Sequence, residues 1–161
     1  MRVYLPATVP LLRDWLAVGV ATPVGLAFGV TPSLREWYRE GDIDELEHAA
    51  SLLAAVASLE LLADDPSAPR RRVVLAADVD DAGVVPDLEE RGALRLRDGV
   101  PSARWASALL DDDDAVPVVS GAVTLLRDAS AGADDVDFAL GEAEAADLGW
   151  YAVQELSDLL G

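Results

Sequence analysis

The chain has 161 residues, of which 30 are aspartate or glutamate and 12 are arginine, and its formal net charge at pH 7 is −18. So large an acidic excess disfavours nucleic acid and anionic membranes as direct partners, because both repel negative charge. The absence of cysteine excludes disulfides, iron–sulfur clusters, thiolate zinc sites and cysteine nucleophiles. A chain of this length can bury a core unaided, and we expect a single domain over residues 1–161.

The N-terminal part of the chain has the pattern of a strand, a helix and a second strand. Residues 1–7 form an extended apolar run that predicts a strand. Thr8 is a suitable N-cap for a helix that ends at Gly19. Residues 24–30, between two prolines, predict the second strand. We interpret this order as a βαβ-like opening with parallel strands.

A short helix and then a long helix are predicted in the middle of the chain. Thr31 and Pro32 mark the start of the short helix and Gly41 its end, and Asp42 caps a long helix that we expect to reach Asp64. The apolar residues of the long helix form two stripes: Ile43, Leu46, Ala50, Leu53, Ala57 and Leu61, and Ala49, Leu52, Val56, Leu59 and Ala63. A helix that is apolar on two sides is usually enclosed, so we expect it against a sheet with another layer nearby.

The second half of the chain alternates predicted strands and helices. Residues 71–79 predict a strand whose residues 73–77 are apolar without alternation, which is typical of a strand covered on both faces. The segment 104–110 is ambiguous between strand and helix, and we interpret it as a strand because an acidic turn follows. The other predicted elements are a strand at 93–97, a helix at 115–128, a loop at 128–137, a helix at 138–147, a strand at 148–153 and a closing helical turn.

These elements predict an α/β (α+β) fold, with a mixed sheet of about five or six strands packed on the long central helix. Residues 8–17 and 115–124 each place a proline in the first turn of a predicted helix that follows a strand. Two such halves around one sheet are found in ferredoxin-like architectures, which we consider as one form of this fold.

Aspartates follow two of the predicted strands. Asp78 and Asp80 lie at the end of the strand at 71–79, and Asp111 and Asp112 come after the strand at 104–110. Clustered carboxylate oxygens suit Mg²⁺ or Ca²⁺, and the two pairs would share one ion if the strand ends meet. The letters VVLAADVDD also resemble the start of haloacid-dehalogenase-type phosphatases, although the next residues and the lack of any lysine depart from that pattern. Solvated turns in an aspartate-rich protein are the alternative.

Two other groups of residues are candidates for binding. Arg70, Arg71 and Arg72 form the basic run of the chain, which would bind a phosphate or carboxylate unless the arginines pair with acids of the same chain. Trp37 and Tyr38 lie on the short helix between charged residues, where they would line a partner surface or join the core. The net charge itself fits solubility, adaptation to salt, or an acidic surface for a basic partner.

Several segments resemble an actinobacterial family of unknown function: MRVYLPAT, AFGVTPSLREWYREGD, DELEHAA, RRRVVLAADV and WYAVQEL. The similarity covers nearly the whole chain. A composition without lysine or asparagine, typical of GC-rich coding, agrees with that source. The resemblance implies a small soluble cytoplasmic protein with no assigned activity, cofactor or catalytic residue.

For function, the sequence favours a non-enzymatic cytoplasmic binding or regulatory module with an unidentified protein partner. No phosphate-binding loop, nucleophile elbow or zinc-protease helix is present in the sequence. The N-terminal segment VYLPATVPLL is too short and too weakly basic for a signal peptide, which favours the cytoplasm. The alternative is a divalent-metal-dependent hydrolase or phosphate-ligand-binding protein that uses the strand-end aspartates. We expect no other cofactor, and the sequence does not set the oligomeric state.

Overall fold

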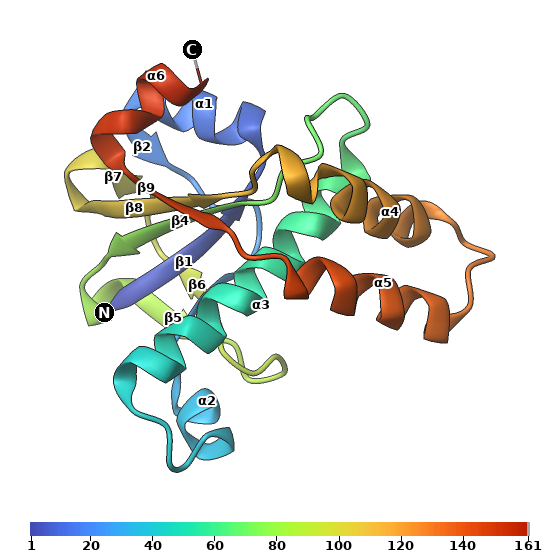
Figure 1. Cartoon of the computed structure of the whole chain (residues 1–161). Helices are drawn as coiled ribbons and strands as arrows, with labels where there is room; N and C mark the ends of the chain where they lie inside the picture. Colours follow the sequence, from blue (N-terminus) through green and yellow to red (C-terminus); the bar gives the residue numbers. More distant parts are fainter. Residues whose placement is uncertain (161) are drawn as a thin grey trace.

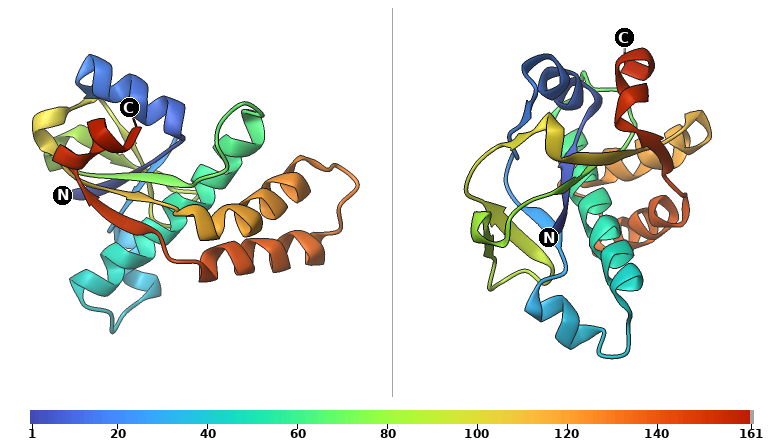
Figure 2. Two further views of the ribbon diagram at one scale, coloured as in Figure 1. Left: turned by 45° about the horizontal axis from the view of Figure 1, so that its top comes forward. Right: turned by 90° about the vertical axis from the view of Figure 1, so that its left-hand side faces the viewer.

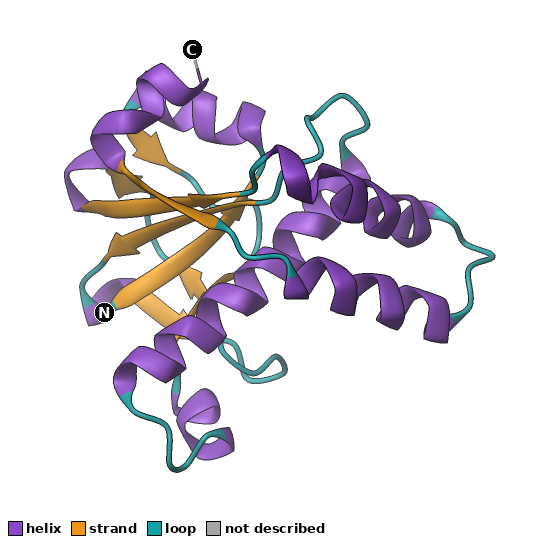
Figure 3. Cartoon of the chain, in the orientation of Figure 1, coloured by secondary structure: helices purple, strands orange, loops and turns teal. Residues whose placement is uncertain are grey.

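A computed structural model describes residues 1–160 of the chain and contains one large sheet with helices on both faces (Figure 1; Figure 3). The sheet has seven strands in the order β5 (Val84–Pro86), β6 (Ala93–Leu96), β3 (Ala27–Gly29), β1 (Arg2–Ala7), β4 (Val73–Asp78), β8 (Trp105–Leu110) and β9 (Gly149–Ala152). A separate two-stranded ribbon pairs β2 (Val20–Ala21) with β7 (Val100–Pro101). All strand pairs within the described residues are antiparallel.

Helices cover the two faces of the sheet unequally. One face carries α1 (Val9–Val18) and the short α6 (Leu156–Leu160), and the other carries α3 (Ile43–Asp64) (Figure 2). The short α2 (Pro32–Trp37) leads into α3, while α4 (Val116–Arg127) and α5 (Ala133–Ala145) form a hairpin that packs on α3 and projects beyond the sheet (Figure 1). The predicted α/β fold, with a sheet packed on a long helix, is confirmed.

The alternation of side chains along β1 explains the two layers. Val3 and Leu5 belong to one buried cluster with Leu12 of α1. Tyr4, between them in sequence, belongs to another buried cluster with Leu46 of α3. Successive side chains of a strand point to opposite faces, so both faces of β1 are apolar and each is covered by a helix.

The predicted helix starts are confirmed by their capping hydrogen bonds. Thr8 Oγ1 accepts from the Leu11 backbone N–H at 3.3 Å, and Asp42 Oδ1 accepts from the Glu45 N–H at 2.9 Å. Gly19 ends α1 with a φ of 82°, a left-handed conformation that favours glycine. These caps depend on side chains within three residues of the groups they satisfy, which is why the sequence predicts them.

Helix α3 has a buried face and a partly exposed face. Its buried residues are Leu46, Ala50, Ser51, Ala54, Ala55, Ser58, Leu59 and Leu62. By length and composition it could cross a membrane, and in this fold it packs against β1, β3, β4 and α4. Ser58 fixes it to the sheet, because the Ser58 hydroxyl donates to the Ala7 carbonyl at 2.7 Å and accepts from the Val73 N–H at 3.0 Å. The buried face is not either predicted stripe, because Ser51, Ala54, Ala55, Ser58 and Leu62 belong to neither and most residues of both stripes are only partly buried. The expectation of a helix enclosed on both stripes is therefore wrong.

Several details of the predicted fold are wrong. The sheet has seven strands and is antiparallel rather than mixed. Strand β3 pairs antiparallel with β1, with Tyr4 opposite Phe28, so the expected parallel βαβ-like opening does not form. The predicted loop at 128–137 gives way to α5 from Ala133, whose first turn contains acids that favour the positive end of the helix. The short α2 ends at Trp37, before Gly41.

Candidate functional site

The partly exposed face of α3 lines two adjoining cavities. The α3 residues that line them recur at helical spacing: Ala49, Leu52, Leu53, Val56, Ala57, Glu60, Leu61 and Asp64. The cavities measure about 210 and 380 Å³ and share Leu53 and Val56. We call the surface formed by these eight α3 residues and their cavities the α3 groove.

One end of the α3 groove is aromatic. Trp37 and Tyr38 line the smaller cavity and expose 62% and 46% of their surface. The Arg91 guanidinium lies 3.5 Å from the centre of the Trp37 ring, a cation–π contact that holds the ring in place. The structure thus brings two residues predicted from the sequence to a hollow surface, together with Arg91, which the sequence analysis did not identify.

The loop at 87–92 forms a wall of the groove because its backbone approaches α3 closely. Gly92 has a φ of 76°, and a Cβ at this position would lie 2.8 Å from Leu53 Cδ1. The Asp87 carboxylate accepts from the Glu89 and Glu90 N–H groups at 2.9 Å each, which lowers the pKa of Asp87 and fixes the turn. This turn places Glu90 at the larger cavity and Arg91 at the smaller one.

Carboxylates border the larger cavity, whose floor is apolar. Glu60, Asp64 and Glu90 line it beside Val24, Leu26 and other apolar side chains. Within the described residues 1–160, no arginine, lysine or histidine lines the larger cavity. Burial raises the pKa of Glu60, and the nearby Glu90 and Asp64 carboxylates raise it further. Negative charge therefore accumulates over an apolar surface without a compensating cation.

Glu60→Gln is expected to stabilise the protein at pH 7. The pKa of Glu60 is raised in the folded state, so ionisation of Glu60 disfavours folding above that pKa. The gain should shrink as the pH falls through the raised pKa, and should vanish below about pH 4, where the carboxyl is protonated in the folded and unfolded states alike. Urea denaturation at neutral and acid pH measures both effects. Glu142→Gln on the exposed surface of α5 is the control, and equal gains in the two variants at pH 7 would contradict the prediction.

The chain can be placed in a family by its sequence. A model described as a family of unknown function (DUF6912) matches residues 1–160. The chain belongs to this family. The resemblance to an uncharacterised family over nearly the whole chain is thereby confirmed. No curated protein and no solved structure is similar enough to count as a match.

In this member of the DUF6912 family, the strand-end aspartates lie at opposite ends of the sheet. Strands β4 and β8 are neighbours, as the shared-ion hypothesis requires, but they are antiparallel, with Val73 opposite Leu110 and Ala77 opposite Trp105. Asp78 and Asp80 therefore lie far from Asp111 and Asp112 along the strands. The expectation that the two pairs converge on one ion is wrong, and residues 1–160 contain no group of three or more acidic, histidine or cysteine ligands arranged for a metal.

The three consecutive arginines are each bonded to groups within the chain. Arg70 donates to the Leu62 and Asp65 carbonyls, and Arg71 pairs with Asp113. Arg72 is buried and pairs with the buried Asp111 carboxylate. Intramolecular pairing, the alternative stated for this run, is the arrangement observed. The three arginines do not form one joint anion site.

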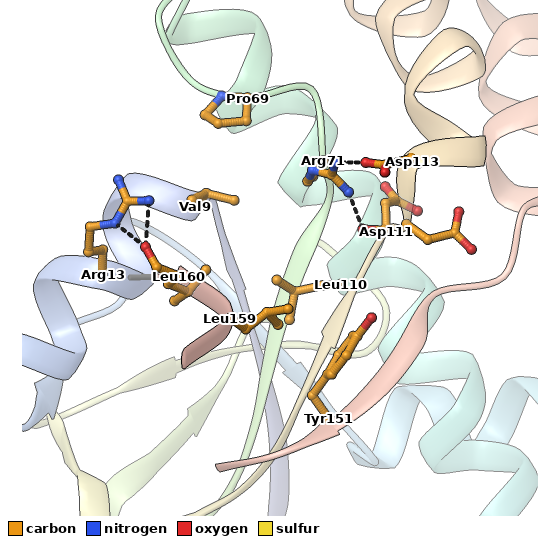
Figure 4. A pocket seen from close by; sticks show the side chains of 11 residues that line it. Val9, Arg13, Pro69, Arg71, Leu110, Asp111, Asp113, Tyr151, Leu159 and Leu160 are labelled. Atoms are coloured by element: carbon orange, nitrogen blue, oxygen red, sulfur yellow. Dashed lines mark hydrogen bonds and ion pairs between the residues drawn. The ribbon is translucent and has the colours of Figure 1, made fainter. Parts of the chain in front are cut away.

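Arg71 also lines a cavity of about 450 Å³ between the end of β8 and the helices α1 and α6 (Figure 4). Arg13 lies on its other side and donates twice to the Leu160 carbonyl, at 3.0 and 2.9 Å. Other residues that line this cavity are Asp112, Asp113, Tyr151 and Leu159. The two guanidinium groups thus already hold protein oxygens, and carboxylates share the cavity with them.

Proposed function

We propose that this protein is a non-enzymatic binding module that takes a protein partner in the α3 groove. The observation that carries the proposal is the solvent exposure of Trp37 and Tyr38 beside an apolar face of α3 whose side chains are only partly buried. Large aromatic side chains are enriched at the centres of protein interfaces, where they contribute much of the binding energy. The cation–π contact of Trp37 with Arg91 favours binding further, because a ring already held in place loses less conformational entropy.

The geometry favours binding over the metal-dependent hydrolase alternative. That alternative needs the aspartates after β4 and β8 on one ion, and the antiparallel pairing of these strands separates them. Asp111 is in addition held by Arg72 in a buried ion pair, which keeps its carboxylate oxygens occupied. The α3 groove, in contrast, is already open to solvent, so a partner can bind there without movement of these strands.

Trp37→Ala is expected to weaken partner binding at least tenfold, because a tryptophan that a partner buries is a frequent hot spot worth about 2 kcal/mol or more. The purified wild-type protein, immobilised, is used to capture its partner from a lysate of the source cells. The affinity of the identified partner is then measured for both proteins.

Trp150→Ala is the matched control, because Trp150 is 65% exposed against 62% for Trp37 but lies on the edge strand β9. It should leave the affinity within about twofold of wild type. Equal affinities for Trp37→Ala and wild type would overturn the proposal.

The source and location of the protein are also part of this proposal. The lack of lysine and asparagine and the single isoleucine support a GC-rich genome such as those of actinobacteria. The acidic surface supports a location in the cytoplasm, where high net charge favours solubility. Separating cell fractions of the source organism and probing them with an antibody to the protein tests the location.

A further inference from the structure

The α3 groove combines two properties that restrict its partner. Its floor is apolar, formed by the partly buried side chains of Leu52, Leu53 and Val56. Its border at the larger cavity carries Glu60 and Glu90, whose negative charges are close enough to raise the pKa of Glu60. An apolar floor with uncompensated carboxylates is complementary to a segment that has both apolar and cationic side chains.

The size of the α3 groove suits a helix of the partner. Its residues run along α3 from Ala49 to Asp64, which at about 1.5 Å per residue spans about 22 Å. A partner helix of about 15 residues has the same length. Amphipathic helices bind grooves of this kind through apolar residues at helical spacing.

A second copy of the chain does not fit these properties. Each copy carries a formal charge of −18, so two copies repel each other. The groove itself would bring the acids of one copy against those of the other. A different, basic molecule can supply the cation that the lining of the larger cavity lacks.

We propose that the α3 groove binds a basic amphipathic helix of the partner protein, with apolar side chains on Leu52, Leu53 and Val56 and an arginine or lysine between Glu60 and Glu90. This inference rests on the proposed binding function and adds the chemistry of the partner to it. It also favours one of the three explanations for the acidity of the chain, an acidic surface for a basic partner, over solubility and adaptation to salt.

The test uses a synthetic peptide of about 15 residues with leucines at helical spacing and arginines on either side of them. Fluorescence anisotropy of the labelled peptide measures its affinity for the full chain at physiological salt, where distant charges are largely screened. A peptide with the same leucines and glutamate in place of arginine is compared with it. We expect the arginine peptide to bind at least tenfold more tightly.

Protein variants show whether peptide binding depends on the carboxylates of the α3 groove or on the net negative charge of the whole protein. Glu60→Gln with Glu90→Gln removes two charges at the groove, whereas Asp14→Asn with Asp158→Asn removes two exposed charges from α1 and α6 on the opposite face. We expect the first pair to weaken arginine-peptide binding at least tenfold and the second pair to change it less than twofold. Equal weakening by both pairs, absence of binding by the wild type, or equal binding of the glutamate peptide would overturn the inference.

Failure of this inference is distinguishable from failure of the proposed function. A partner whose binding depends on Trp37 but which docks through an acidic segment would overturn the basic-helix inference alone. Binding unaffected by Trp37→Ala would overturn the binding function itself. A wild-type dimer in sedimentation experiments that dissociates on Val56→Asp would identify a second copy as the occupant and would also overturn the inference.

Discussion

Asp111→Ala is expected to destabilise the protein by about 3–5 kcal/mol, the usual cost of leaving one member of a buried ion pair without its partner. The side chains of Arg72 and Asp111 expose 2% and 0% of their surface. Arg72 Nε and Nη2 donate to the two Asp111 oxygens at 2.8 and 2.7 Å, and the Arg72 backbone N–H donates to Asp111 Oδ2 at 2.7 Å. Without Asp111, a buried guanidinium would keep a single carbonyl acceptor, that of Ala146 at 2.8 Å.

Asp113→Ala is the matched control for this prediction. Asp113 also pairs with an arginine, Arg71, but its side chain is 89% exposed. Exposed ion pairs contribute about 0–1 kcal/mol, so the control should change the free energy of unfolding by no more than that. Urea denaturation measures both variants, and Asp111→Asn, which keeps an acceptor oxygen, serves if Asp111→Ala does not fold. A cost for Asp111→Ala or Asp111→Asn no larger than that of Asp113→Ala would contradict the structural role of the buried pair.

Leu62→Ala is expected to destabilise the protein by about 2–5 kcal/mol, the range for removing a fully buried leucine side chain and leaving a cavity. Leu62 is fully buried and belongs to the cluster that joins α3 to α4, with Val119 and Val123. Its neighbour Leu61 lines the larger cavity of the α3 groove and is only partly buried. Because less of its surface is removed from water, Leu61→Ala should cost about 1 kcal/mol or less.

The Leu61 and Leu62 variants share one helix and one chemical change, so helix propensity cancels between them. Chemical denaturation gives the two free energies of unfolding. Equal costs would show that Leu61 and Leu62 are buried to the same degree, and that would remove the basis for an open groove.

Part of the α3 groove was predictable from the sequence. The stripe with Leu52 and Val56 and the adjacent pair Trp37 and Tyr38 follow from helical spacing and from the position of aromatic residues between charges. Glu90 and Arg91 were not predictable as its wall, because a turn fixed by Asp87 and the close approach of Gly92 to Leu53 bring them there. That approach joins residues far apart in the chain.

The sequence by itself determined the local features of this protein: the helix caps at Thr8 and Asp42, the glycine end of α1, and the position of β4. Each depends on hydrogen bonds or periodicity within a few residues, so neighbouring residues suffice to specify it. The tertiary structure alone decided the direction of β3, the separation of the aspartates after β4 and β8, and the face of α3 that stays open. These features depend on which distant elements pack together, and that packing is fixed by burial of the whole apolar surface and not by any single segment.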